Sequence, residues 1–162
     1  MNTNTLGTAY YLRFGDHTMA NQEVKVFKFN NIGDSKGPVI NLDFAEKNVV
    51  EMPVFYREAG SNPEGHFHKG TDASFNPQFV YVLKGKMEFT CIYPDGQTEV
   101  FIVEELEGIV LPKLVYHRYK TLDYTIFCEP RLEKYDKNSN DKIICSAEDY
   151  PKLISEILKN EE

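Results

Sequence analysis

Two histidines that flank a single phenylalanine are the residues of this chain best suited to chemistry. If His66-Phe67-His68 is a β-strand, its period of two points both imidazoles to one face and Phe67 to the other. Such a pair can move protons near neutral pH or, as neutral imidazoles, bind a transition metal. His117 follows a second block of strand pattern and is the candidate third member. The alternative is a pair of surface histidines on an edge strand.

Length and composition limit the class of protein. A chain of 162 residues is long enough for one domain with a proper core. Its formal net charge of −7 argues against a surface that contacts nucleic-acid phosphates. The three cysteines have no short pair spacing, which indicates neither a disulfide framework nor a cysteine metal site and favours a reducing cytoplasm. Because no apolar run approaches ~18 residues and the N-terminus is polar, we expect neither a membrane span nor a secretory signal.

Most of the chain has the pattern of antiparallel β-sheet. Tyrosine and phenylalanine occur 10 and 11 times and favour strands. Turn residues such as Lys84-Gly85-Lys86 and Pro94-Asp95-Gly96-Gln97 separate short alternations of apolar and polar residues. The predicted strands lie near residues 24–29, 39–44, 49–56, 66–68, 78–83, 87–93, 99–103, 108–112, 117–120 and 124–128, with Pro53 marking a strand start or a sheet edge. This succession of short strands predicts an all-β sandwich or barrel.

The two ends of the chain differ from this β part. Residues 1–23 are predicted to form an extension, residues 24–130 the β-barrel, and residues 131–162 a charged, solvated connection followed by an amphipathic helix. The segment Ser146-Ala147-Glu148-Asp149 offers a helix cap. The apolar stripe of the helix, expected to pack on the barrel exterior or on a partner subunit, consists of Tyr150, Leu153, Ile154, Ile157 and Leu158.

The spacing of these residues resembles the two sequence boxes of the cupin superfamily, whose members are small β-barrels of the jelly-roll type. The matching positions are Gly60, His66, His68, Gln78 and Gly85 for the first box, and Gly108, Pro112 and His117 for the second. Metal-binding cupins have a glutamate where this chain has Gln78, and Leu114 replaces the glycine usual in the second box. The resemblance implies that a divalent transition metal, if bound, would have as its ligands His66, His68, Gln78 and His117.

A narrower resemblance, from about residue 24 to residue 158, is to the WxcM-like sugar-nucleotide 3,4-ketoisomerases. These cupins act on thymidine-diphosphate keto-sugars without a metal. Asp34-Ser35-Lys36-Gly37 stands where that group has Asp-Ser-Arg-Gly, and His66-Phe67-His68-Lys69 stands where it has His-Ala-His-Lys. The group shares Gln78 and the segment 108–112 that leads to His117.

This narrower resemblance implies a site in which both histidines lie beside the sugar. A tyrosine from the preceding strand completes it, and Tyr56 is the candidate. The arginine that the group has just before the histidines is missing here, since Asn62-Pro63-Glu64 stands in its place. Arg57 or Lys69 can supply that charge from another position. The candidates for substrate binding are therefore Lys36, Arg57, Lys69, Gln78 and His117.

The chemistry implied is a ketoisomerisation. Moving a carbonyl from C4 to C3 of a sugar needs a base at C3, an acid at C4 and a donor for the enediolate between them. His66 or His68 is the predicted base, and the other histidine or Tyr56 is the acid or oxyanion donor. Two alternatives stay open: a metal-dependent cupin of the dioxygenase type, and a cupin that binds a sugar nucleotide without turnover.

The resemblance also implies partners. It indicates a homodimer, in which residues 1–23 can serve as a swapped strand, and a small-molecule sugar nucleotide as the ligand. No cofactor is expected in this interpretation, and a divalent transition metal belongs to the alternative. We expect neither nucleic acid nor a membrane as a partner.

Overall fold

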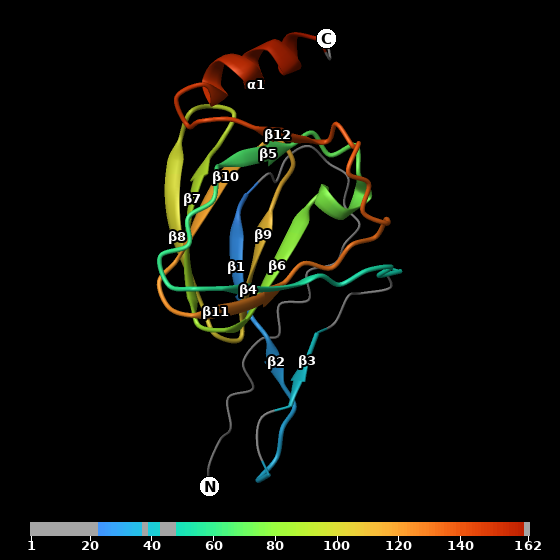
Figure 1. The fold of residues 1–162 in the computed structure, drawn as a ribbon, viewed down its shortest axis with the longest axis vertical. Helices are drawn as coiled ribbons and strands as arrows, with labels where there is room; N and C mark the ends of the chain where they lie inside the picture. Colours follow the sequence, from blue (N-terminus) through green and yellow to red (C-terminus); the bar gives the residue numbers. More distant parts are fainter. Residues whose placement is uncertain (1–22, 37–38, 43–47, 161–162) are drawn as a thin grey trace, which may run out of the picture.

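The structure, a computed structural model, describes residues 23–36, 39–42 and 48–160 and consists mainly of two antiparallel sheets. The first sheet contains β1 (Lys25–Lys28), β4 (Val54–Arg57), β6 (Gln78–Lys84), β9 (Glu107–Leu111) and β11 (Thr125–Cys128). The second contains β5 (His66–His68), β7 (Lys86–Ile92), β8 (Thr98–Glu104), β10 (Tyr116–Thr121) and β12 (Lys142–Ile144). Their strand orders are β1-β9-β6-β11-β4 and β12-β5-β10-β7-β8. Figure 1 shows the two sheets as the layers of one body.

Four smaller elements complete the described part of the chain. The strands β2 (Asn30–Asn31) and β3 (Ile40–Asn41) form a pair that projects from the body, at the bottom of Figure 1. A short 3-10 helix, η1 (Ala73–Phe75), lies in the polar loop before β6. The helix α1 (Tyr150–Lys159) covers the other end of the molecule, at the top of Figure 1.

The main core lies between the two sheets and comes from every second residue of the facing strands. On β6, Val80 and Val82 are 2% and 0% exposed, and on β7 Met87 and Phe89 are 0% and 1% exposed. These side chains belong to one packed cluster, as expected when alternate residues of two sheets interdigitate. The all-β jelly-roll fold with a C-terminal helix is confirmed. Among the described residues no ladder joins the two sheets, so the predicted barrel is an open sandwich.

The helix α1 packs on the outer face of the second sheet, because Phe67 of β5 points away from the main core. The ring centroids of Phe67 and Tyr150 are 5.4 Å apart. Tyr150 and Ile154 are 0% and 2% exposed, and the Tyr150 hydroxyl donates a 2.6 Å hydrogen bond to the carbonyl oxygen of Leu114. The predicted helix and its position on the exterior are confirmed.

Several other predicted segments have mixed outcomes. The extension up to residue 22 and the end of the 39–44 strand lie outside the described residues. Pro53 directly precedes β4, which is an edge strand as predicted. The charged stretch 131–142, predicted to be solvated, ends in a strand that pairs with β5. Within the described ranges, no helix is long and apolar enough to cross a membrane.

The packing of α1 predicts unequal effects for two apolar residues of the helix. Ile154→Ala removes a buried side chain and should lower the free energy of unfolding by about 2–4 kcal/mol. Leu158→Ala, at a side chain that is 39% exposed, should cost less than about 1 kcal/mol. Urea denaturation followed by circular dichroism measures both. Equal costs for the two variants would contradict the packing described for α1.

Candidate functional site

Three histidines meet inside the sandwich, near the end where β5 lies. His117 of β10 is directly opposite His66 of β5 in the antiparallel ladder, so their side chains share one face. The ring centroid of His66 is 4.4 Å from that of His117 and 5.1 Å from that of His68. One ring nitrogen from each residue lies within 4.8 Å of the others. The structure thus brings together the three histidines that the sequence analysis selected.

Burial keeps these imidazoles neutral. Loss of solvent, followed by the charge of His68, lowers the pKa of His117 to about 3. The pKa of His66 is lowered far below its ordinary value, by burial first and by the charges of His117 and Lys142 next. Burial also lowers the pKa of His68, against the opposing effect of a hydrogen bond to Asp141. Neutral imidazoles can accept a proton or ligate a metal, which are the two roles that the sequence predicts.

A buried carboxylate, Asp141, orients His68. The His68 Nδ1 and the Asp141 Oδ2 are 2.8 Å apart, and the two side chains are 4% and 1% exposed. The Asp141 Oδ1 accepts hydrogen bonds from the backbone N–H and the hydroxyl of Thr71, at 2.6 and 2.8 Å. Burial alone would raise the pKa of Asp141, but the hydrogen bonds from His68, Thr71 and Asp72 lower it, so the carboxylate is charged. With Nδ1–H donated to Asp141, the basic atom of His68 is Nε2.

The loop formed by residues 71–77 is part of this site. Its η1 places Phe75 flat against the His68 ring, with centroids 3.9 Å apart and an interplanar angle of 9°. The guanidinium carbon of Arg131 lies 5.3 Å from the centroid of Phe75. His68 is therefore fixed by stacking as well as by its hydrogen bond to Asp141.

Two ionisable residues from the end of the β part lie near the imidazoles or near Gln78. Lys142 of β12 is directly opposite His68, so its side chain projects on the same face. Its charge contributes to the lowered pKa values of His66, His68 and His117, as expected for an ammonium group near the cluster. Glu129 follows β11; burial raises its pKa, while the charge of Arg131 and a hydrogen bond with Gln78 oppose this.

Gln78 begins β6 and is 5% exposed. Gln78 is opposite Leu111 in the ladder and two residues before Val80 on the same strand. Leu111 and Val80 both belong to the main core, so the side chain of Gln78 also points toward the interior. The Gln78 Oε1 is buried and has no hydrogen-bond partner among the described residues. A free carbonyl oxygen of this kind is available to a ligand.

Tyr56, the predicted acid or oxyanion donor, does not join the histidines. Its neighbour Phe55 stacks on Phe127 of the main core, with centroids 4.8 Å apart, so the alternation of β4 turns Tyr56 outward. Tyr56 is 60% exposed. The side chain of Arg57 points inward instead, like that of Phe55, and its Nε donates a 3.4 Å hydrogen bond to the hydroxyl of Tyr119.

The two predicted lysines lie apart from the inward-facing set. Lys36 is exposed in the connection between β2 and β3, a strand pair at the other end of the molecule from β5 (Figure 1). Lys69 follows β5 and is half-buried, and its backbone N–H donates a 2.9 Å hydrogen bond to the Asp141 carbonyl oxygen.

Asp141, Lys142 and Glu129 are the site residues that sequence reasoning missed. All three lie in or beside the stretch 131–142, where a high density of charge favours a solvated interpretation. The one available signal is the pattern Ile143-Ile144-Cys145, an apolar run directly after Asp141-Lys142, which is long enough for a short strand.

Comparison with known proteins identifies the fold. No family model and no curated protein matches the chain. Among solved structures, a 3,4-ketoisomerase from Helicobacter canadensis is 14% identical over 83% of this chain and 99% of that chain, with a TM-score of 0.66. The sugar 3,4-ketoisomerase QdtA from Thermoanaerobacterium thermosaccharolyticum, in complex with TDP, is 16% identical over 83% and 96%, with a TM-score of 0.65. The chain has the cupin fold of the sugar 3,4-ketoisomerases.

A second group of structures shares this cupin fold. The dTDP-4-dehydrorhamnose 3,5-epimerase from Bacillus anthracis, with TDP and PPi bound, is 19% identical over 75% of this chain and 78% of that chain, with a TM-score of 0.57. Identities this low establish the fold, and the roles of individual residues in this chain rest on its own geometry.

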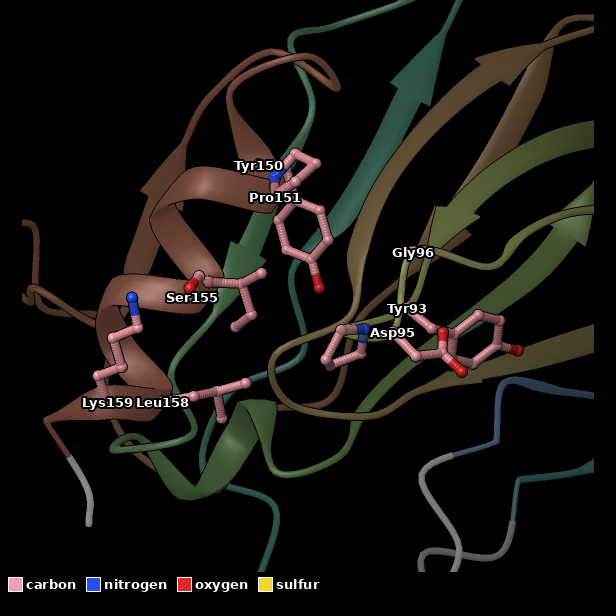
Figure 2. A pocket seen from close by; sticks show the side chains of 10 residues that line it. Tyr93, Asp95, Gly96, Tyr150, Pro151, Ser155, Leu158 and Lys159 are labelled. Carbon is pink, nitrogen blue, oxygen red and sulfur yellow. The ribbon is translucent and has the colours of Figure 1, made fainter.

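One pocket of the protein lies outside the histidine cluster. It has a volume of about 360 Å³ and separates α1 from the turn between β7 and β8, as Figure 2 shows. Pro94, Tyr150, Ile154 and Leu158 contribute to its lining. Pro94 belongs to the turn between β7 and β8 and the other three residues belong to α1, whereas the imidazoles face the opposite sheet.

The neutral imidazoles predict how the stability of this protein depends on pH. An unfolded histidine binds a proton below about pH 6.5, whereas His117 in the folded protein binds one only near its pKa of about 3. The unfolded state therefore binds more protons between these values, and the free energy of unfolding should fall as the pH falls. His117→Asn should reduce the slope between about pH 6 and pH 4 by about 1.4 kcal/mol per pH unit.

Urea denaturation at a series of pH values measures this slope. Above about pH 7.5 the slopes of the wild type and of His117→Asn should coincide, because neither state then carries a proton on this histidine. Identical slopes at acid pH would contradict the burial described for His117.

Proposed function

We propose that this protein is a metal-independent 3,4-ketoisomerase that acts on a nucleotide-linked 4-keto-6-deoxyhexose of the dTDP type. The observation that carries the proposal is the arrangement of His68, a neutral imidazole whose Nδ1–H is held by buried Asp141 and whose Nε2 is left basic. This arrangement occurs inside a fold shared with sugar 3,4-ketoisomerases, one of which is in complex with TDP.

The first half of the reaction breaks the C3–H bond. His68 Nε2 takes the proton, the C–H electron pair forms a C3–C4 double bond, and the electrons of the carbonyl pass to O4. Asp141 stabilises the imidazolium that forms, as the carboxylate of a hydrolase triad does. His66, a neutral imidazole 5.1 Å away between ring centroids, is the second candidate to hydrogen-bond the reacting oxygens.

Substrate binding is assigned to the polar groups that share the inward face. Gln78 and His117 border the histidine pair, and Gln78 offers an unpartnered oxygen to a sugar hydroxyl. Arg57, which hydrogen-bonds Tyr119 on the inward side, is the candidate for the charge of the missing family arginine. The roles of Lys36 and Lys69 stay predictions.

The predicted homodimer also belongs to this proposal. Val54 and Tyr56, on the outward face of edge strand β4, are 45% and 60% exposed. Tyr124, which directly precedes β11, is 42% exposed. Exposed apolar side chains on an edge strand are a surface that a second copy can cover.

A metal-dependent cupin is the second candidate function. Three ring nitrogens within 4.8 Å of one another are a set that a divalent transition metal can use. His68 and His117 hydrogen-bond oxygen acceptors through Nδ1, at 2.8 Å to Asp141 and 3.1 Å to the Val115 carbonyl, which is the usual outer-shell pattern of metal-binding histidines. A bound metal would supply Lewis-acid chemistry, with Gln78 Oε1 as a possible fourth ligand.

The proposed function predicts turnover of TDP-4-keto-6-deoxyglucose by the wild-type protein, with exchange of the C3 proton in deuterium oxide. His68→Asn should lower the rate at least 100-fold, because it removes the base, while TDP binding stays within threefold. Proton NMR measures exchange and product. Binding of TDP with no exchange by the wild type would refute catalysis and favour a cupin that only binds a sugar nucleotide.

A thermal melt separates the first candidate from the second. TDP at 100 times its dissociation constant should stabilise the protein by about 2.7 kcal/mol, which corresponds to a rise of roughly 5–10 °C for a chain of this size. We expect this rise to be unaffected by a chelator. A lower melting temperature with chelator, restored by a divalent metal and without a response to TDP, would favour the metal-dependent cupin.

A further inference from the structure

Two of the three inward-facing imidazoles have no N–H group left to give to a substrate. A neutral imidazole has one N–H group, and in His68 and His117 that group is Nδ1–H, already donated to Asp141 and to the Val115 carbonyl. Tyr56 points to the outside of the sandwich. The ketoisomerisation nevertheless needs a proton for O4 when the C3–H bond breaks, so a group other than His68, His117 and Tyr56 must supply it.

Lys142 is a proton-bearing group that the strand pairing places beside His68. It stands directly opposite His68 on the neighbouring strand, and directly opposed residues of antiparallel strands project on the same face with Cβ atoms about 5 Å apart. Because β12 is an edge strand and Lys142 is exposed, its flexible side chain can reach the mouth of the site.

The two arginines of this region are less suited to the role. Arg57 is committed to the Tyr119 hydroxyl and to the carbonyl oxygen of Tyr56, at 3.4 and 2.9 Å. Arg131 lies over the rings of Phe75 and Tyr135. A guanidinium also holds its proton too tightly to exchange it during turnover, whereas a lysine ammonium can give and retrieve one.

We propose that Lys142 is the catalytic acid of the ketoisomerisation, an inference that rests on the function proposed above. As His68 takes the C3 proton, the Lys142 ammonium protonates O4 and leaves a neutral enediol and a neutral amine. In the second half the amine takes the proton from O3, the O3 electrons form the C3 carbonyl, and the C3–C4 electron pair takes the proton from His68 at C4. Both side chains return to their starting states, and the carbonyl has moved from C4 to C3.

The test uses TDP-4-keto-6-deoxyglucose as the substrate and compares variants of two lysines. Lys142→Met and Lys142→Ala should lower kcat at least 100-fold while TDP binding stays within threefold. Lys120→Met, on the outward face of β10, is the matched control and should keep kcat within twofold of the wild type. Propylamine added to Lys142→Ala should restore activity at least tenfold, a response that a structural role would not give.

The outcomes separate the two proposals. Wild-type activity together with a kcat of Lys142→Met within threefold of wild type would overturn the role of Lys142 and leave the proposed function intact. Loss of activity in Lys142→Ala without rescue by propylamine, or with a matching loss of TDP binding, would also overturn it. A wild-type protein that does not turn over the substrate would refute the proposed function itself, and the inference with it.

Discussion

The pairing of β5 with its two neighbours is the constraint on which the rest of the site depends. This three-residue strand lies between β10 and β12 in the second sheet. Its register places His66 opposite His117 and His68 opposite Lys142, while Phe67, between the two histidines, turns outward to pack against Tyr150. A shift of one residue would bury the phenylalanine in the site and expose both imidazoles under α1. One strand therefore fixes the chemistry on one face and the helix on the other.

Burying three imidazoles is costly, and the surrounding groups offset part of that cost. His68 and Asp141, 73 residues apart in the chain, satisfy each other at 2.8 Å. Thr71 donates twice to the same carboxylate, so the loop before η1 is tied to the segment before β12. The buried Nδ1 of His66 and Oε1 of Gln78 have no hydrogen-bond partner within the described residues, and such atoms are expected where a ligand binds.

Sequence reasoning found the part of the site that depends on local periodicity. His66 and His68 share a face because strands alternate, and the helix stripe follows from helical spacing. Tyr56 is selected through the family resemblance. Only one of the neighbours Phe55 and Tyr56 can point into the core, and Phe55 does so by stacking on Phe127, which turns Tyr56 outward. Asp141 and Lys142 were missed because the burial of Asp141 and the direction of Lys142 depend on a strand pairing with β5, and the charge around them resembles a solvated connection.

The central claim is that three neutral imidazoles share one interior space, with His68 protonated at Nδ1. NMR of the ¹⁵N-labelled histidine rings, with His68 assigned by comparison with His68→Asn, measures the charge and the tautomer of each ring directly. The account predicts that the three rings are still neutral at the ordinary histidine pKa of about 6.5, with the His68 proton on Nδ1. Titration of these rings near the ordinary pKa of about 6.5, or a His68 proton on Nε2, would contradict it.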